Sequence, residues 1–413
     1  MKVISLTRRV SINKRVLVLT ATFPRWHGDS EPPFVFELCK RLGDQFDVVV
    51  LAPHADGAKQ FERMGSIDIM RFRYFIPRWE KLAYQGGILA NLKRNRWCYL
   101  LLPFYFLAQL SAMWRILRHQ RIDLIHAHWL IPQGLTVAIA GIFTKNIPPM
   151  ICTSHGGDLL GLNGPLLNAM KRWVIHCSSQ LTVVSQTMEA RALSLGASPE
   201  KLKILSMGVE TSALFTPATA TSRMHNQVLF VGRLVEKKGC TYLLGAMPEI
   251  LRRHPDTRLE IVGSGPEKKA LQQQADRLGV ADAVTFHGIV NNTEIPEFYR
   301  RATVFVAPSI ITAQGDQEGL GLVLVEALSC ECPVVASDLP AIRDVVSDGV
   351  TGLVCMQENS SDLADKICFL LDHPETREKM GKAGRQHVRE QFDWSVISRR
   401  YAALIENLVQ EHP

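Results

Sequence analysis

Two glutamates beside a glycine-rich turn are the residues in this chain best suited to chemistry. Glu318 and Glu326 are separated by seven residues in the stretch EGLGLVLVEA. The apolar run Val304–Ala307 before them predicts a buried parallel strand, and the pattern of Leu322–Ser329 predicts a helix. Backbone N–H groups at such a strand-to-helix turn favour anionic or hydroxyl-rich ligands, because the helix dipole attracts negative charge and glycine allows close approach. Both carboxylates can then face one cleft and contact different parts of one long ligand.

Further motifs flank this stretch in a fixed order. They are Val231-Gly232-Arg233-Leu234 with Lys238-Gly239, then Ile261–Pro266, Phe286–Val290, Cys332–Ser337 and Asp344–Val354. Together with the Glu-x7-Glu spacing they resemble glycosyltransferase family 4, a retaining family with the two-domain GT-B fold. One such motif would be weak support, whereas several in order are strong support. The alternative is that the two glutamates are solvated helix carboxylates.

Arg233 and Lys238 are the cations that the resemblance places on the diphosphate of a nucleotide sugar. Arginine can fork onto two phosphate oxygens and lysine acts as a mobile point charge, so both stabilise charge that grows on a leaving diphosphate. Lys238 is preferred over Lys237 because it directly precedes Gly239, as in the family. Ordinary surface cations are the alternative. A nicotinamide-binding turn is disfavoured because Lys268 occupies the place of its third glycine.

The remaining donor contacts are implied by the resemblance. Glu326 would accept hydrogen bonds from the ribose, Glu318 would hold hydroxyls of the transferred sugar, and backbone near Val290 would edge the base. The full donor-binding set is Gly28, Arg233, Lys238, Val290, Glu318, Gly319, Leu320, Gly321, Leu322 and Glu326; the catalytic set is His155, Glu318, Arg233 and Lys238. Gly28 stands where the family places a glycine-containing loop near the phosphates, although family loops often carry a glycine pair.

The first half of the chain supplies the expected acceptor side. His155, in the loop after the apolar strand Met150–Thr153, resembles a family residue that touches the donor sugar, and it would support developing charge there. A histidine that only caps a turn is the alternative. Asp158 would bind acceptor or cap the following helix. His128 is placed on the acceptor side; with His126 it shares one face of a strand, but no third ligand is evident, so no metal site is expected.

The elements that must position these residues alternate between strand and helix patterns along both halves. This predicts two Rossmann-like, doubly wound parallel-sheet domains facing each other across a cleft. The strands expected are Val16–Thr20, Val48–Ala52, Leu124–Ala127, Met150–Thr153, Leu181–Val184, Val228–Val231, Leu259–Val262, Val284–Phe286, Val304–Ala307 and Val334–Ala336. The predicted domains are residues 1–206 and 207–394, with Thr211–Gln227 in the linker zone and a terminal helix, about 395–413, crossing back onto the first domain.

Composition agrees with a two-domain globular enzyme. The 413 residues exceed the usual size of one hydrophobic core, and the nine cysteines form no C-x-x-C pair. Residues 1–200 hold 24 Lys and Arg against 13 Asp and Glu, whereas residues 201–413 hold 23 against 27. No nucleic-acid motif accompanies the basic half, so a membrane surface or a phosphate-bearing substrate is favoured. Met1–Arg15 lacks the apolar core of a secretory signal, which predicts a cytoplasmic protein.

Residues 71–114 are the segment expected to touch a membrane. Basic residues alternate with aromatic residues from Arg71 to Trp97, and the apolar run Tyr99–Trp114 follows. That run is shorter than a bilayer span and contains Pro103 and Gln109, so it does not read as transmembrane. It suits docking at the anionic inner face of the cytoplasmic membrane; a buried core helix under a basic face is the alternative.

The sequence therefore predicts a retaining, metal-independent hexosyltransferase without a cofactor. It would move sugar from a nucleoside diphosphate to a lipid-linked glycan or surface polysaccharide precursor. A nucleotide-sugar epimerase or hydrolase of the same fold, and a non-catalytic sugar-nucleotide-binding module, are the alternatives. The base, the sugar, the acceptor and the oligomeric state are not encoded in recognisable motifs.

Overall fold

The chain forms two compact units in the computed structural model, which describes residues 13–29, 31, 33–144, 146–218 and 225–412. The first unit runs to Val183 and also takes in Ala192–Leu205 and the segment from Ser398 onward. The second unit comprises Val184–Arg191 and Ser206–Ile397. Residues 1–12 of the segment Met1–Arg15, which lacks the apolar core of a secretory signal, and residues 219–224 of the predicted linker zone lie outside the described residues.

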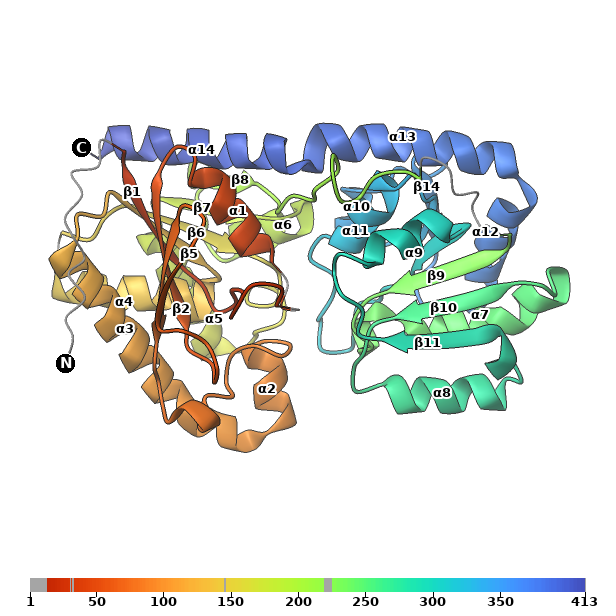
Figure 1. Cartoon of the computed structure of the whole chain (residues 1–413), viewed down its shortest axis with the longest axis horizontal. Helices are drawn as coiled ribbons and strands as arrows, with labels where there is room; N and C mark the ends of the chain where they lie inside the picture. The colour runs from red at the N-terminus through yellow and green to blue at the C-terminus, as the bar shows by residue number, and fades with distance from the viewer. Residues whose placement is uncertain (1–12, 30, 32, 145, 219–224, 413) are drawn as a thin grey trace. The chain divides into compact units, whose positions relative to one another are not determined.

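The first unit is built on an eight-stranded sheet in the order β3-β4-β2-β1-β5-β6-β7-β8 (Figure 1). Its strands are β1 Arg15–Leu19, β2 Asp47–Pro53, β3 Phe61–Met64, β4 Ile67–Phe72, β5 Leu124–His128, β6 Met150–Ser154, β7 Gln180–Val183 and β8 Leu202–Ile204. All neighbours pair in parallel except β3 and β4. The central strands β5 and β6 are buried along their whole length, as expected for a sheet covered on both faces.

Helices connect these strands. They are α1 Phe34–Leu42, η1 Pro77–Trp79, α2 Ile88–Arg94, η2 Arg96–Leu101, α3 Leu102–His119, η3 Leu130–Gly134, α4 Leu135–Phe143, α5 Pro165–Cys177, α6 Gln186–Ser194 and η4 Pro199–Lys201. Apolar residues recur on one face of α1, where Val35, Leu38, Cys39 and Leu42 are buried. This periodicity holds the helix against the sheet and leaves the carboxyl ends of the strands to the loops.

The second unit contains a six-stranded, fully parallel sheet in the order β11-β10-β9-β12-β13-β14. The strands are β9 Gln227–Val231, β10 Arg258–Val262, β11 Val284–Gly288, β12 Val304–Ala307, β13 Val334–Ser337 and β14 Gly352–Cys355. The helices are η5 Glu236–Lys238, α7 Cys240–Arg253, α8 Lys268–Arg277, η6 Ala281–Ala283, α9 Ile295–Arg301, α10 Leu322–Ser329, α11 Pro340–Arg343, α12 Ser360–Asp372 and α13 Pro374–Phe392.

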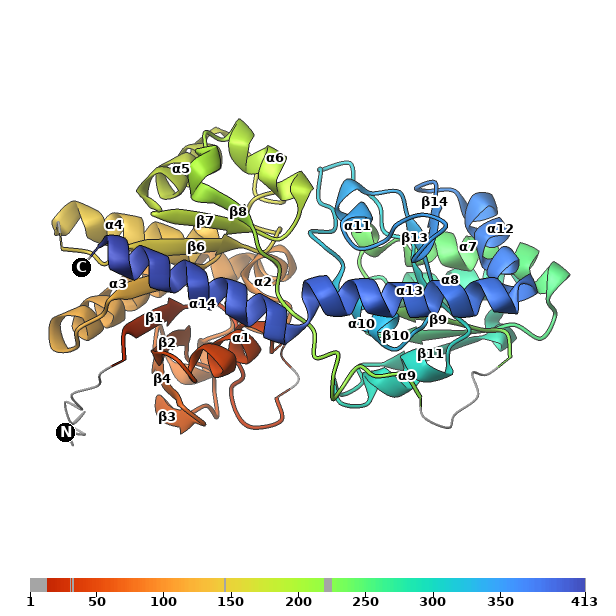
Figure 2. The same cartoon turned by 90° about the horizontal axis from the view of Figure 1, so that it is seen from above.

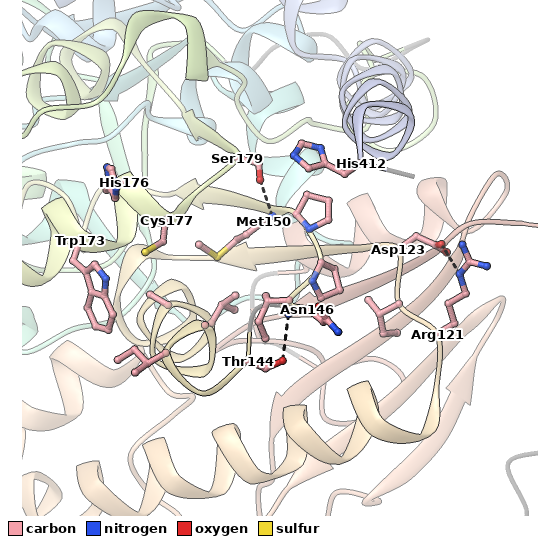
Figure 3. A pocket seen from close by; sticks show the side chains of 18 residues that line it. Arg121, Asp123, Thr144, Asn146, Met150, Trp173, His176, Cys177, Ser179 and His412 are labelled. Atoms are coloured by element: carbon pink, nitrogen blue, oxygen red, sulfur yellow. Dashed lines mark hydrogen bonds and ion pairs between the residues drawn. The ribbon is translucent and has the colours of Figure 1, made fainter.

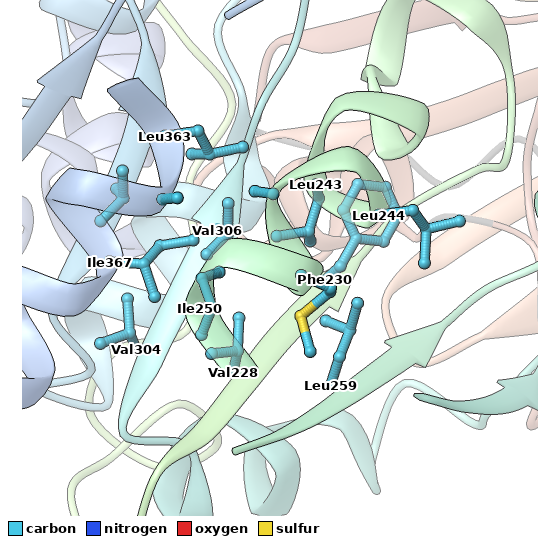
Figure 4. Packing of buried hydrophobic residues seen from close by; sticks show 14 of the residues in the cluster. Val228, Phe230, Leu243, Leu244, Ile250, Leu259, Val304, Val306, Leu363 and Ile367 are labelled. Carbon is cyan, nitrogen blue, oxygen red and sulfur yellow. The ribbon is translucent and has the colours of Figure 1, made fainter. Parts of the chain in front are cut away.

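One apolar cluster holds the second unit together. Leu243 and Ile250 of α7 and Ile367 of α12 pack with strand residues such as Val228 and Val306, all of them fully buried (Figure 4). Burying one such side chain stabilises the fold by roughly 1.5–3 kcal/mol. This packing therefore fixes the sheet, and with it the positions at which the loops leave the strand ends.

The terminal helix α14, Trp394–Glu411, begins in the second unit and continues in the first. The carboxylate of Asp393 accepts a hydrogen bond from Ser395 N at 2.8 Å, which caps the start of the helix. Beyond Ser398 the helix lies across the sheet of the first unit, and Tyr401 and Ile405 are fully buried there (Figure 2).

The two parallel sheets confirm the predicted α/β class. Each predicted strand is present, shifted at its ends by no more than two residues, whereas β3, β4, β8 and β14 were missed. Three of the missed strands, β3, β8 and β14, are short and lie at sheet edges, whereas β4 has six residues and lies between β3 and β2. β3 alternates between exposed and half-buried residues without an apolar face. The structure also groups Val184–Arg191 with the second unit, where Gln186 N donates to Asp344 Oδ2 at 2.8 Å.

Candidate functional site

The turn before α10 carries Glu318 and begins the helix on a glycine. Gly321 has a φ of 84°, and a Cβ on it would lie 3.2 Å from Leu324 Cδ1 and 3.3 Å from Ile342 Cδ1. Among the described residues, no side chain caps the first N–H groups of α10. Leu324 N donates to Gly321 O at 2.9 Å, and the N–H groups of Leu322 and Val323 are available to an anionic or hydroxyl-bearing ligand.

Lys238, the last residue of η5, forms an ion pair through its Nζ with Oε2 of Glu318 in this turn. Their side chains are 14% and 15% exposed, so the pair is largely shielded from water while still reachable. Burial alone would raise the pKa of Glu318, but the charge of Lys238 and its hydrogen bond outweigh that effect and lower the pKa. Glu318 is therefore ionised at neutral pH, and two of the predicted catalytic residues share one site.

The neighbouring Lys237 has a different role. Its Nζ lies 2.9 Å from Asp316 Oδ1 and 3.2 Å from Gln317 O, which ties down the loop that leads to Glu318. Lys237 thus binds the part of the loop at Asp316 and Gln317, and Lys238 binds the next residue, Glu318. Only Lys238 contacts the predicted ligand-binding carboxylate.

Glycines bring the strand-end loops of this unit into close contact. Gly239 has a φ of 64°, and a Cβ on it would lie 1.8 Å from Pro308 O. A Cβ on Gly263 would lie 1.9 Å from Gly232 O. Only glycine fits either position. The exposed Arg233 follows β9 and the half-buried Val290 follows β11, so both lie at the carboxyl ends of strands, where open α/β sheets bind ligands.

Glu326 faces a buried tyrosine that the sequence did not single out. Tyr299 Oη donates to Glu326 Oε2 at 2.9 Å, and Tyr299 itself is fully buried against Phe305. Burial raises the pKa of Glu326 to about 7, although the tyrosine hydrogen bond and Lys238 lower it in part. This carboxyl therefore changes charge near neutral pH.

Three histidines form a cluster in the first unit. His128 Nδ1 lies 2.9 Å from His155 Nε2, and the two rings are stacked with an interplanar angle of 8°. His126 packs against His128 with ring centroids 4.2 Å apart. His126 and His128 are fully buried, whereas His155 is half-buried at the end of β6. Burial lowers the pKa of all three rings, so they are neutral at pH 7.

Asp158 is buried, and both of its carboxylate oxygens accept hydrogen bonds from groups within the protein. Its Oδ2 accepts from Leu130 N and its Oδ1 accepts from Ser154 Oγ, each at 2.7 Å. These bonds join the loop after β5 to the loop after β6 and fix the backbone around His155. The carboxylate caps η3 rather than the helix that follows it in the chain.

Gly28 lies exposed in the loop after β1 with a φ of 79° and open space around its Cα. Arg25 and Asp29 clamp that loop through two side-chain hydrogen bonds of 2.7 and 2.8 Å. The loop conformation therefore requires glycine for its backbone and not for close packing.

Within the described residues, no group of three or more His, Cys, Asp or Glu could hold a metal ion. His126 Nε2 instead lies 2.7 Å from Thr153 Oγ1, and His128 bonds to His155.

The segment expected at a membrane is only partly exposed. Its exposed apolar side chains, which we call the apolar ridge, are Ile76, Trp79, Trp97, Tyr99, Leu100, Phe104 and Leu107. Arg71 and the rings of Tyr74 and Tyr84, in contrast, are buried. Arg71 pairs with Glu62 and donates to Pro24 O at 2.7 Å, so it braces the first unit and does not reach an interface.

The helical stretch Arg96–His119 is long and apolar enough, by length and composition, to cross a membrane. The predicted apolar run, Tyr99–Trp114, was shorter because the helical stretch begins earlier, at Arg96 in η2, and continues to His119 in α3. Tyr105, Met113 and Ile116 of α3 are nevertheless buried, which makes this helix part of the first unit's packing.

The first unit also has a hollow of about 1010 Å³ (Figure 3). It is lined by residues that precede strands, among them Asp123 before β5, Pro149 before β6 and Ser179 before β7. It therefore lies at the amino ends of the strands, away from the end at which such sheets bind substrates. No predicted site residue lines it.

Tyr299, Thr182 and Tyr401 are the contributors that sequence reasoning missed. In the sequence none of them belongs to a recognisable motif, and in the structure each has its hydroxyl bonded inside the protein. Only the rule that a buried hydroxyl needs a partner could have drawn attention to them, and the partner is not visible in the sequence.

Comparison with known proteins gives two family matches. Residues 33–213 match the family described as Glycosyltransferase Family 4, and residues 216–387 match Glycosyl transferases group 1. A GDP-mannose-dependent alpha-(1-6)-phosphatidylinositol monomannoside mannosyltransferase of Mycolicibacterium smegmatis is 32% identical over 402 residues, which cover 94% of this chain and 98% of the relative. A glycogen synthase of Mycobacterium tuberculosis is 28% identical over 290 residues, 68% of each chain.

Solved structures with the same architecture are more distant in sequence. Sucrose-phosphate synthase from Thermosynechococcus elongatus superposes with a TM-score of 0.77 at 20% identity and covers 97% of this chain and 100% of that one. Anabaena HepE in complex with UDP gives a TM-score of 0.69 at 19% identity, with 95% and 100% covered. At these identities the likeness establishes the fold.

Proposed function

This chain belongs to glycosyltransferase family 4, and from that premise we propose that it transfers a hexose from a nucleoside diphosphate sugar, with retention, to a hydroxyl of a lipid-linked glycan or polysaccharide precursor. The family, the glycosyltransferase activity and the GT-B fold expected from the sequence are confirmed. Retention, the donor, the acceptor and the residue roles form the proposal.

The observation that carries it is the Lys238–Glu318 pair beside the uncapped start of α10. Without ligand, the two charges neutralise each other. A diphosphate would compete for Lys238, because phosphate oxygens are strong acceptors. Glu318 would then be free to accept hydrogen bonds from hydroxyls of the sugar, so one ligand would satisfy both partners.

The other donor contacts follow from position. Arg233 would share the diphosphate with Lys238, Glu326 would accept from the ribose, and backbone near Val290 would border the base. Gly319, Leu320, Gly321 and Leu322 would present N–H groups to the sugar or phosphate. Gly28 and the half-buried His155 would contribute from the first unit.

The proposed chemistry is front-face attack. The acceptor hydroxyl would attack the anomeric carbon on the side from which the diphosphate leaves, and the leaving phosphate oxygen would take the hydroxyl proton. Arg233 and Lys238 would stabilise the charge on the departing diphosphate without a metal. Covalent catalysis by Glu318 is the alternative.

We favour GDP-mannose as the donor, because the relative aligned over nearly the whole chain is GDP-mannose-dependent and acts on a phosphatidylinositol monomannoside. A lipid acceptor fits the apolar ridge, whose residues are interspersed in the sequence with the exposed cations Arg78, Lys93, Arg94 and Arg96. Aromatic and basic side chains together suit the surface of an anionic membrane. We therefore place the protein in the cytoplasm, peripheral to the inner face of the membrane.

The test is thermal stabilisation by GDP-, UDP- and ADP-sugars, measured on the wild type and on Lys238→Ala. A ligand at 100 times its Kd stabilises the native state by about 2.7 kcal/mol. We expect one nucleotide class to raise Tm and the variant to lose that rise. Lys237→Ala is the matched control and should keep most of it. A rise that survives in Lys238→Ala would contradict the site.

Acceptor dependence separates transfer from the competing activities. An epimerase or hydrolase would consume donor at the same rate with no acceptor present, and a non-catalytic module would bind donor without turnover. We expect donor consumption to require a lipid acceptor.

A further inference from the structure

A chain of buried hydroxyl groups links the terminal helix to the histidine cluster. Tyr401 Oη donates to Leu205 O at 3.2 Å. Thr182 Oγ1 lies 3.5 Å from Tyr401 Oη and 2.6 Å from Thr153 Oγ1. Thr153 Oγ1 in turn lies 2.7 Å from His126 Nε2. All four side chains are buried, so none of them can touch a substrate directly.

The carbonyl of Leu205, at one end of this series of hydroxyl groups, determines which group donates in each hydrogen bond. A carbonyl only accepts, so the single proton of Tyr401 points at Leu205 O. Tyr401 must then accept from Thr182, and Thr182 must accept from Thr153 by the same reasoning. Thr153 has no second proton to give, so His126 must donate to it from Nε2. The hydroxyl chain therefore selects the Nε2–H tautomer of His126.

His126 also packs against His128, with the two rings tilted by 32°, and His128 in turn is stacked with His155. The centroid of the His126 ring lies 4.2 Å from that of His128, on one side, and 5.5 Å from the ring of Tyr401. His128 is bonded to His155 at 2.9 Å. A rotation of His126 would displace His128, because buried rings in close packing have no free space beside them. The orientation of His155 thus depends on His126, which acts on it through His128 and is not hydrogen-bonded to it.

We propose that Thr182 and Tyr401 are positioning residues for His155. By holding His126 in one orientation and one tautomer, they fix the ring of His128 and, through it, the ring that faces the substrate. The inference rests on the proposed role of His155 in transfer. It assigns a function to the terminal helix, which carries Tyr401, and to a hydroxyl on β7, neither of which touches the reacting groups.

The decisive comparison is Thr182→Val against Thr182→Ser. Valine keeps the shape of threonine and removes the hydroxyl, whereas serine keeps the hydroxyl. We expect Thr182→Val to lower kcat by about tenfold to hundredfold with little change in the donor KM, as for a misplaced catalytic group. Thr182→Ser should restore kcat to within a few-fold of the wild type. His155→Ala sets the scale of the full loss.

A second readout does not depend on activity. In ¹⁵N-labelled protein, the imidazole nitrogen shifts of His126, assigned with a His126→Gln variant, should show a protonated Nε2 and a bare Nδ1. We expect that signature to persist in Thr182→Ser and to change in Thr182→Val. Tyr401→Phe, which removes only the terminal hydroxyl, serves as the second variant if Thr182→Val fails to fold.

The outcomes distinguish failure of the positioning role of Thr182 and Tyr401 from failure of the proposed role of His155 in transfer. If His155→Ala leaves transfer unchanged, the proposed role of His155 fails. If His155→Ala abolishes transfer while Thr182→Val and Tyr401→Phe match the wild type in kcat, the positioning role is overturned. A wild-type His126 protonated on Nδ1 would overturn it as well.

Discussion

Glu326 carries a carboxyl whose charge changes near neutral pH. Its pKa is raised to about 7, mainly by burial, from a usual value of 4.5. In the ligand-free protein the folded state therefore holds a proton that the unfolded chain has released, so this group's contribution to stability falls as pH rises from about 4.5 to about 7.

Donor binding should show the opposite pH dependence. Ribose hydroxyls donate to a carboxylate, so only ionised Glu326 offers two acceptor oxygens. We expect the Kd for the nucleotide to rise by up to about tenfold for each pH unit below 7 and to be constant above pH 7. Isothermal titration between pH 5.5 and 8.5 measures this, and Glu326→Gln should flatten the profile. A profile that is flat in the wild type would contradict the assignment.

Tyr299 provides a finer test of the same carboxylate. Its hydrogen bond lowers the pKa of Glu326, so Tyr299→Phe should raise that pKa further and move the binding profile to higher pH. Donor affinity should fall several-fold at pH 7 and recover toward the wild-type value near pH 8.5. A uniform loss across the pH range would instead indicate damage to the fold.

At the level of elements, the start of α10 depends on the backbone of Gly321. Gly321→Ala forces an L-residue into a left-handed conformation, which costs roughly 1–2 kcal/mol, and sets its Cβ against Leu324 and Ile342. We expect lower stability together with weaker donor binding. Gly279→Ala is the matched control, because Gly279 has a φ of 67° with open space around it and lies in the turn after α8. The control should lose stability in urea unfolding and keep its donor Kd.

The apolar ridge makes a prediction for the η2–α3 segment. Leu100→Glu should weaken binding to vesicles of anionic phospholipid, since it removes apolar contact and adds repulsion. Leu166→Glu on α5 changes a side chain of similar exposure, 68% against 60%, and should leave vesicle sedimentation unchanged. Equal losses in both variants, or none in Leu100→Glu, would argue against the ridge as the docking surface.

Most strands predicted from the sequence are apolar and buried along nearly their whole length, whereas the missed edge strands β3 and β8 are partly exposed. Val334–Ser337 and Leu322–Ser329 could be predicted because apolar periodicity is local. The edge strand β3 has no such pattern and exists through its antiparallel partner β4. In the same way Glu318 and Lys238 carried recognisable motifs, whereas Tyr299 and Tyr401 act through partners distant in the chain.

For the molecule as a whole, the two units should respond separately to core mutations. Ile405 on α14 belongs to the first unit and Ile367 on α12 to the second, and both are fully buried. Replacing either with alanine should cost about 2–5 kcal/mol in the unit that contains it. We expect Ile367→Ala to lower the thermal transition that donor raises, and Ile405→Ala to lower the other. Calorimetry with and without donor distinguishes the two, and a single transition lowered equally by both variants would contradict independent units.

The division of the chain into segments also has a consequence for its synthesis. The second unit is closed by Ile397, whereas the first waits for the segment from Ser398 onward. Chains emerge from the ribosome amino terminus first, and domains generally fold as they become complete. The unit that begins first along the chain is therefore completed after the second unit, and Tyr401 reaches Thr182 only once the second unit has been synthesised. A product terminated before Ser398 would retain the residues proposed to bind donor and lack the part of α14 proposed to set His155, so we expect it to bind donor and to transfer sugar poorly.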